Sequence, residues 1–163
     1  ILKADVDGII LDVRNNPGGL LGEAINLAGF WVNGETVVVE RIGDERREFA
    51  ASGIAQLAGI PTVVLVNGGS ASGSEILAGA LQDYGMATLI GEQTFGKGSV
   101  QDYYEYPDSS AVKVTIAEWL TPFGRSINQV GIAPDIEVLY TIEDYNEKRT
   151  PQLQAAIDFL SSN

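Results

Sequence analysis

The chain has 163 residues, of which 45% are hydrophobic, so it can form one compact domain with a buried core. Its 22 acidic and 10 basic residues give a net charge of −12, which argues against binding to nucleic acids or to anionic membrane surfaces. The absence of cysteine excludes disulfides and thiolate metal sites, and the absence of histidine excludes a Ser-His-Asp triad built from this chain.

Short apolar and β-branched runs predict the strands of the first half, and apolar residues at helical spacing predict its helices. In chain order we expect a strand at 8–13, a sharp turn at 15–19, a helix at 20–32, a strand at 36–42, a hairpin and loop at 44–59, a strand at 61–66, a helix at 72–84 and a strand at 87–90. The residues expected to face the core from these helices are Leu21, Ala24, Leu27, Ala28 and Trp31, then Ile76, Leu77, Ala80 and Leu81.

The second half predicts an antiparallel pair of strands at 99–106 and 111–119, then a loop-rich stretch, then a helix at 151–160. The residues of this last helix expected to face inward are Leu153, Ile157 and Leu160. Strands that alternate with helices predict an α/β fold with helices packed on a sheet. No run approaches the roughly 20 apolar residues of a membrane span.

Ser72 is the first candidate for chemistry, because a strand runs through Gly68-Gly69 into a helix that opens near this serine. The first backbone N–H groups of a helix are free, and they can stabilise an oxyanion during acyl transfer. Ser72-Gly-Ser-Glu75 is also a capping box, which needs no chemistry and which the local sequence alone favours. The Gly-x-Ser-x-Gly elbow is absent.

Lys97 is the candidate base. A serine hydroxyl needs an adjacent base, and without histidine lysine is the remaining common one, of which this chain has four. A free lysine has a pKa near 10.4, and burial lowers it. Lys97 lies between two glycines with apolar Ile90 and Phe95 nearby, whereas the other three lysines occupy terminal, charged or solvent-facing positions. We therefore expect a desolvated setting for Lys97 alone.

The segment around Lys97 has a rival interpretation. Gly91-Glu-Gln-Thr-Phe-Gly-Lys97 fits the phosphate-binding pattern Gly-x-x-x-x-Gly-Lys. Gly98 stands where the Mg²⁺-binding Ser or Thr belongs, and a strand is expected next instead of the helix that a P-loop needs. Nucleotide binding is therefore the weaker hypothesis.

Three further features have a functional and a structural interpretation. The turn Asn15-Asn-Pro-Gly-Gly19 lies between a strand and a helix, so it offers a second oxyanion donor or is an ordinary turn. Asp83 lies about three helical turns after Ser72, so we expect it to brace a loop and not to contact the serine. Gln101 either orients Lys97 by a hydrogen bond or is a plain edge-strand glutamine.

Six motifs span almost the whole chain in a fixed order: Asp12-Val-Arg-Asn-Asn-Pro-Gly-Gly19, Glu23-Ala-Ile-Asn-Leu-Ala-Gly29, Val64-Leu-Val-Asn-Gly-Gly-Ser-Ala-Ser72, Ser74-Glu-Ile-Leu-Ala-Gly-Ala-Leu-Gln-Asp83, Gly91-Glu-Gln-Thr-Phe-Gly-Lys-Gly98 and Gly131-Ile-Ala-Pro-Asp135. With them the chain resembles the catalytic domain of a C-terminal processing peptidase, the tail-specific serine protease family. This combination is far more specific than any one of its motifs.

The resemblance implies a role for each matching residue. Ser72, the middle serine of its run, is the implied nucleophile, Lys97 the general base, and Gln101 the support of the lysine. The backbone N–H groups of Gly73 and Gly19 are the implied oxyanion hole. Gly73 stands where the family commonly has alanine, which keeps the N–H donor but loosens the start of the helix.

The resemblance also implies the setting. It implies repeated β-β-α units with helices on a mixed sheet, like those of the crotonases and the Clp protease subunit, and no cofactor. It implies protein substrates with apolar C-terminal tails, an extracytoplasmic location, and one catalytic domain over residues 1–163 of a longer chain whose PDZ-like domain is absent here. Partners other than substrate are left open, including a homo-oligomer, and so is a non-catalytic peptide- or ligand-binding domain of the same fold.

Overall fold

A parallel sheet forms one side of the protein. The computed structural model describes residues 6–162. The strands of the sheet, in spatial order, are β1 (Ile9–Asp12), β4 (Thr62–Val66), β5 (Thr88–Gly91) and β8 (Ile136–Glu137). Every residue of β4 is buried, as expected of a central parallel strand that is covered on both faces.

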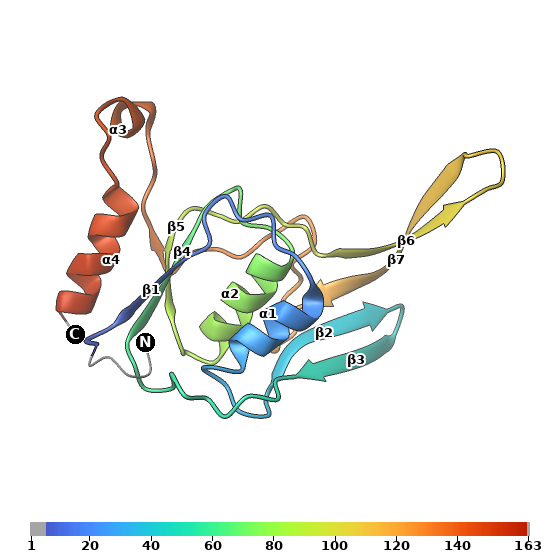
Figure 1. Cartoon of the computed structure of the whole chain (residues 1–163), viewed down its shortest axis with the longest axis horizontal. Coiled ribbons are helices and arrows are strands. Elements are labelled where there is room, and N and C mark those ends of the chain that lie inside the picture. The colour runs from blue at the N-terminus through green and yellow to red at the C-terminus, as the bar shows by residue number, and fades with distance from the viewer. Residues whose placement is uncertain (1–5, 163) are drawn as a thin grey trace.

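The other four strands form an antiparallel sheet. Their spatial order is β3 (Glu45–Ala50), β2 (Thr36–Ile42), β7 (Ala111–Leu120) and β6 (Ser99–Glu105). The outer part of the β6–β7 hairpin projects from the body as an arm (Figure 1). Parallel and antiparallel strands therefore lie in separate sheets of the same α/β fold.

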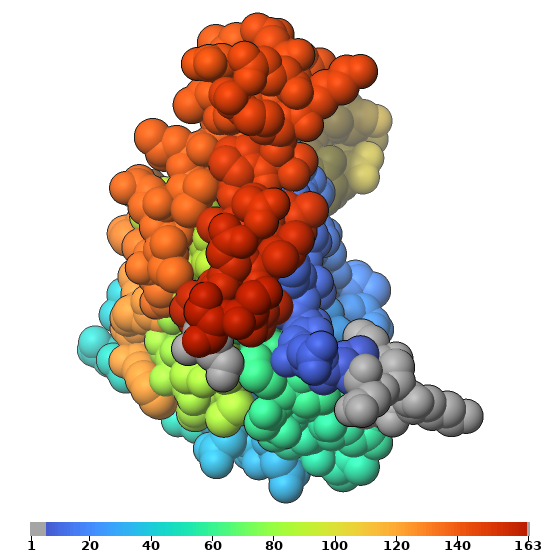
Figure 2. All heavy atoms as spheres, turned by 90° about the vertical axis from the view of Figure 1, so that its left-hand side faces the viewer, coloured from blue at the N-terminus to red at the C-terminus, as the bar shows by residue number. Residues whose placement is uncertain are grey.

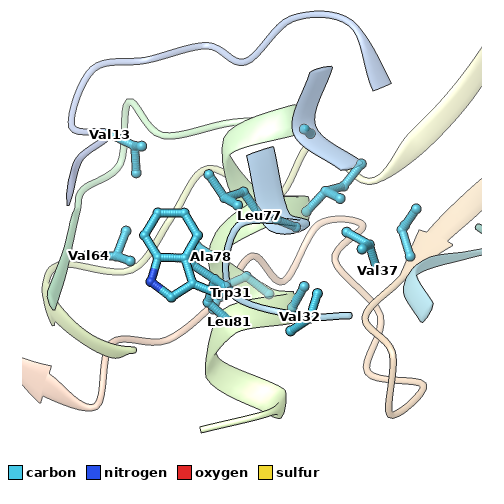
Figure 3. Close-up of a cluster of buried hydrophobic side chains, with 14 of the residues drawn as sticks. Val13, Trp31, Val32, Val37, Val64, Leu77, Ala78 and Leu81 are labelled. Atoms are coloured by element: carbon cyan, nitrogen blue, oxygen red, sulfur yellow. The ribbon is translucent and has the colours of Figure 1, made fainter. Parts of the chain in front are cut away.

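Helices α1 (Leu21–Ala28) and α2 (Gly73–Asp83) pack against each other between the two sheets (Figure 1). They contribute to the main core together with Trp31, whose ring lies among Val64, Leu77 and Leu81 (Figure 3). The indole N–H donates a 3.0 Å hydrogen bond to the Thr62 hydroxyl, so the buried ring has no unpaired polar atom.

Helix α4 (Pro151–Ser161) covers the outer face of the parallel sheet, with the short helix α3 (Ile142–Asn146) beyond its N-terminal end (Figure 2). A second core cluster lies under α4, where Ala156 is fully buried against Val63, Leu65 and Ile90. No helix in the described part of the chain is long and apolar enough to cross a bilayer.

The predicted α/β class is confirmed, and the predicted elements are present, most of them with shifted ends, while α3 and β8 were not predicted. Two residues expected in the core are exposed. Ile157 is 44% exposed because its neighbour Ala156 faces the sheet, and one helical step of 100° turns Ile157 toward solvent. Leu27 is 37% exposed because it lines a cavity that is described below.

Candidate active site

Two glycine-rich turns meet at one edge of the parallel sheet. Because β1 and β4 are parallel neighbours, the turns that follow them leave the sheet at the same edge. The Asn16 carbonyl accepts hydrogen bonds from the Ala71 N–H at 3.0 Å and from the Ser74 hydroxyl at 3.1 Å. Gly18 has a φ of +85°, and a Cβ added there would lie 2.4 Å from the Ala71 carbonyl oxygen. This contact between turns therefore requires glycine.

Ser72 is held in an unusual backbone conformation, with φ 55° and ψ −119°. N-cap residues ordinarily have extended backbone angles, so capping alone does not account for this geometry. Its neighbours Ser70 and Ser74 donate their hydroxyls to the backbone carbonyls of Val13 and Asn16. Those two serines hold the turns together, which leaves Ser72 as the candidate nucleophile.

The backbones of Gly19 and Gly73 approach each other beside Ser72. A Cβ added at Gly73 would lie 3.3 Å from the Gly19 nitrogen, which shows how closely the two backbones approach. Within residues 6–162, neither N–H has a hydrogen-bond acceptor. Two adjacent N–H groups without acceptors, one at a helix N-terminus, can stabilise an oxyanion.

A cavity of about 220 Å³ opens beside these donors. The apolar residues of its lining are Val13, Leu20, Ala24, Leu27 and Leu77. Gly18, Gly19 and Gly73 also line it, and Glu23 adds a carboxylate. A side chain bound in this cavity would lie next to a carbonyl at the Gly19 and Gly73 amides.

Glu75 is fully buried, and its carboxylate joins the segment of Ser72 to that of Lys97. One oxygen accepts the N–H groups of Ser72 at 2.8 Å and of Lys97 at 2.9 Å. The other accepts the Thr94 hydroxyl at 2.6 Å and the Gly96 N–H at 2.7 Å. The sequence prediction identified Glu75 only as a capping-box partner. A signal was nevertheless available, because Glu75 is followed on this helix by the apolar residues Ile76, Leu77 and Ala78.

The setting expected for Lys97 is not found. Its backbone is fixed by Glu75, but its side chain is exposed, and no hydrogen bond joins it to Ser72 in this structure of residues 6–162. Phe95, expected to shield it, is 67% exposed. The strand β6 follows Lys97, so the P-loop hypothesis lacks the helix that it requires.

Within residues 6–162, no hydrogen bond joins Gln101 to Lys97. It lies on the exposed part of the β6–β7 hairpin, where its side-chain nitrogen is 3.5 Å from the Thr115 hydroxyl. A register shift between Val100 and Gln101 changes the pairing of the hairpin at this point. The structure therefore brings Ser72, Gly19 and Gly73 together, whereas the side chain of Gln101 is exposed and is hydrogen-bonded to Thr115.

Asp83 braces a loop, as predicted. Its carboxylate accepts the Phe123 N–H at 2.8 Å and forms an ion pair with Arg125. Both partners belong to the connection after β7, so Asp83 fixes that connection to the end of α2.

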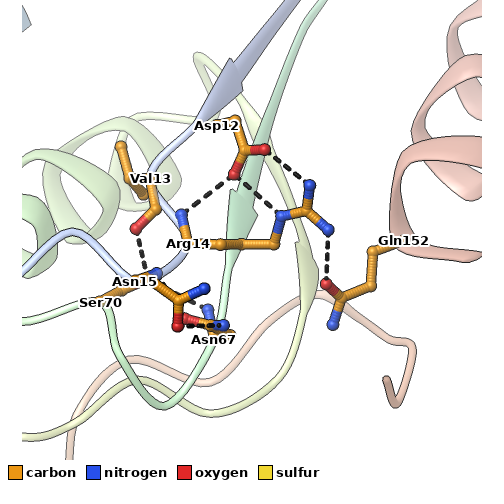
Figure 4. A network of polar contacts seen from close by, with 7 residues as sticks. All are labelled: Asp12, Val13, Arg14, Asn15, Asn67, Ser70 and Gln152. Atoms are coloured by element: carbon orange, nitrogen blue, oxygen red, sulfur yellow. Dashed lines mark hydrogen bonds and ion pairs between the residues drawn. The ribbon is translucent and has the colours of Figure 1, made fainter. Parts of the chain in front are cut away.

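A charged pair fixes the end of β1 to α4 (Figure 4). Arg14 donates to both carboxylate oxygens of Asp12, at 2.9 and 2.6 Å, and to the side-chain oxygen of Gln152 at 3.0 Å. The guanidinium holds the pKa of the Asp12 carboxyl below its ordinary value, and partial burial opposes that shift. This pair anchors the start of the turn that carries Gly19.

Comparison with known proteins relates these features to peptidases. Residues 1–138 match the sequence profile of peptidase family S41. The carboxyl-terminal-processing protease of Synechocystis sp. is 48% identical over 160 residues, which cover 95% of this chain and 37% of that protein. The chloroplastic carboxyl-terminal-processing peptidase 3 of Arabidopsis thaliana is 49% identical over 138 residues, which cover 82% of this chain and 26% of that protein.

A solved structure, the photosystem II D1 C-terminal processing protease, superposes with a TM-score of 0.76 at 42% identity. The superposition covers 82% of this chain and 35% of the other. The chain thus spans less than half the length of these relatives.

Proposed function

Since the chain belongs to peptidase family S41, we propose that it is the catalytic domain of a serine endopeptidase that cleaves proteins near their C-terminal tails. The observation that carries this proposal is the strained Ser72 beside the two N–H groups of Gly19 and Gly73, which have no acceptor within the described residues. The names of the similar carboxyl-terminal-processing enzymes support the choice of substrate region.

The proposed mechanism uses Ser72 as nucleophile and Lys97 as base. Neutral Lys97 takes the proton from Ser72 Oγ as this oxygen attacks a peptide carbonyl carbon. The oxyanion accepts hydrogen bonds from the Gly19 and Gly73 amides. Protonated Lys97 then gives its proton to the leaving amine, and an acyl ester on Ser72 remains. A water molecule, deprotonated by Lys97, hydrolyses this ester and restores the hydroxyl, so the chemistry requires neither a metal ion nor a nucleotide.

Substrate binding has to complete this site, because the Lys97 side chain is exposed. A peptide bound across Ser72 would cover both Lys97 and the neighbouring exposed ring of Phe95 and so exclude water from the amine. Glu75 fixes the backbone of Lys97 in advance, so only the side chain needs to move. For Gln101 to support Lys97 as proposed, the conformation of the β6–β7 hairpin near Gln101 has to change as well.

The apolar cavity supports an apolar residue immediately before the cleaved bond. Its volume of about 220 Å³ lies below the ~300–1,000 Å³ of typical small-molecule sites, which fits a single side chain. We therefore propose substrates with apolar C-terminal tails. We also propose an extracytoplasmic location for the intact protein, on the family resemblance.

A cleavage assay with the intact protein tests this function. The substrate is a peptide with an apolar C-terminal tail, and mass spectrometry of the products identifies the cleaved bond. Ser72→Ala and Lys97→Ala should each abolish turnover, whereas the exposed controls Ser52→Ala and Lys113→Ala should leave it unchanged. A near-normal rate in either active-site variant would overturn the assignment.

The second candidate function is a non-catalytic peptide-binding domain. The exposed side chain of Lys97, which has no hydrogen bond to Ser72 in residues 6–162, favours it. In that case the intact protein would bind the same peptide without cleaving it, and Ser72→Ala would bind it equally well.

A further inference from the structure

Two asparagines join the glycine-rich turns where these turns leave the sheet (Figure 4). The Asn67 side-chain oxygen accepts the N–H groups of Asn15 at 2.9 Å and of Gly69 at 3.0 Å. Its side-chain nitrogen donates to the side-chain oxygen of Asn15 at 3.1 Å. The two amides therefore bridge residues that are 52 positions apart in the sequence. We call this pair the amide clasp.

The backbone conformation and the close packing around the clasp accommodate the two asparagine side chains. Asn15 has a φ of 55°, a left-handed conformation that asparagine tolerates better than most residues. Gly69 lies so close that an added Cβ would be 2.7 Å from the Asn15 side-chain oxygen. The buried Ser70 hydroxyl completes the junction, because it accepts the Asn67 N–H at 3.1 Å and donates to the Val13 carbonyl at 2.7 Å.

The clasp lies at the start of both segments that carry the oxyanion donors. From Asn15 the chain reaches Gly19 in four residues, and from Asn67 it reaches Gly73 in six. Between these points the Asn16 carbonyl forms the next connection by accepting the Ala71 N–H. The separation of the two N–H groups therefore depends on the junction at which both segments begin.

We propose that Asn15 and Asn67 are positioning residues for the peptidase reaction, which set the distance between the Gly19 and Gly73 N–H groups. This inference rests on the proposed function. Neither Asn15 nor Asn67 lines the apolar cavity beside the Gly19 and Gly73 amides, so the clasp acts on the reaction through the turns. Removing it should weaken transition-state stabilisation and leave substrate binding in the apolar cavity intact.

The test compares three variants of the intact protein with the wild type. Asn67→Ala removes the whole clasp. Asn15→Gly keeps the left-handed backbone and removes only the bridge between the two side chains. Asn33→Ala, at an exposed turn residue, is the matched control. The measurements are kcat and KM for the tail peptide, thermal unfolding, and deuterium exchange of residues 14–19 and 76–83.

Loss of one oxyanion donor lowers kcat by roughly 10²–10³-fold, and a displaced donor should cost less. We expect Asn67→Ala to lower kcat about tenfold or more, Asn15→Gly to lower it a few-fold, and KM to change less than about twofold. Exchange should accelerate in 14–19 and stay constant in 76–83. If Asn67→Ala fails to fold, a lower kcat and faster exchange of residues 14–19 in Asn15→Gly support the proposal.

Two results would contradict the proposed role of the clasp without contradicting the proposed function. The first is an active wild type with kcat within about twofold in both clasp variants. The second is a fall in kcat without faster exchange in 14–19. If the wild type, like the Ser72→Ala variant, did not cleave the peptide, the proposed function would be overturned, and the catalytic role of the clasp with it.

Discussion

Replacing Glu75 by glutamine tests the most buried polar connection of the site. The carboxylate accepts four hydrogen bonds, two at each oxygen. Glutamine keeps the size but exchanges one oxygen for an NH2 group, which cannot accept. With this group toward Ser72 and Lys97, two backbone N–H groups lose their acceptor. In the other orientation the Thr94 hydroxyl can accept a hydrogen bond from the NH2 group and turn its own O–H elsewhere, so the Gly96 N–H is the one backbone donor that loses its acceptor.

The orientation with the NH2 group toward Thr94 and Gly96 costs less free energy, so it determines the expected loss of stability. A hydrogen bond to a charged group contributes about 1.5–3 kcal/mol, and a buried donor without a partner costs about 1–3 kcal/mol. Glu75→Gln should therefore lower the free energy of unfolding by about 3 kcal/mol, against a typical total of about 5–15 kcal/mol. For a domain of this size, that corresponds to a fall in Tm of about 6–12 °C. The protein should remain folded.

The assay is thermal unfolding together with the rate of peptide cleavage. Glu45→Gln in β3 is the matched control, because it makes the same charge change at an exposed position. We expect the cleavage rate of Glu75→Gln to fall as well, since its carboxylate fixes the backbone of Ser72. Should Glu75→Gln unfold at the same temperature as Glu45→Gln and cleave at the same rate, the proposed connection between Ser72 and Lys97 would be refuted.

Three further changes test other parts of the site. Gly18→Ala should reduce kcat by about 10²-fold or more, as a lost oxyanion donor would. Gly34→Ala, also at positive φ but with open space around it, should keep kcat and lose only about 1–2 kcal/mol of stability. Ala24→Leu should narrow the apolar cavity, so KM should rise for peptides with a large apolar residue before the cleaved bond and stay constant for alanine. Arg14 lowers the pKa of Asp12, so the stabilisation is present above pH about 4 and is lost as the pH falls through the lowered pKa. In urea unfolding, Asp12→Asn should therefore be less stable than wild type at pH 7, and this difference should shrink as the pH falls below about 4, whereas a difference that does not change with pH would contradict this explanation.

Local patterns were sufficient to predict most of the secondary structure. The β-branched run predicted β2 with the bounds that the structure has, and the glycine-rich turns were located because they follow apolar strands. The four residues of α2 that helical spacing predicted to face the core are buried, but so is every other residue from Gly73 to Leu81, which the spacing did not predict. The exposure of Ile157 was missed since that same spacing does not say which of two adjacent apolar residues faces the sheet.

The connections within the site could not be predicted from the sequence. The Glu75 carboxylate binds the backbone of Lys97, about 20 positions further along the chain, and the amide clasp joins two residues that are 52 positions apart. Such contacts depend on which strands become neighbours, and local spacing does not encode that. The exposure of Lys97 is a property of the packing around it, which glycine neighbours and a nearby phenylalanine do not determine.

The most direct test of the proposed chemistry is to locate a covalent adduct on the intact protein. A fluorophosphonate reacts with an activated serine, and mass spectrometry of the digested protein identifies the modified residue. We predict modification of Ser72 and not of Ser70 or Ser74, whose hydroxyls are bonded to backbone carbonyls, and much slower labelling in Lys97→Ala. An adduct on another serine, or equally fast labelling of Ser72 in Lys97→Ala, would contradict the proposal that Lys97 activates Ser72.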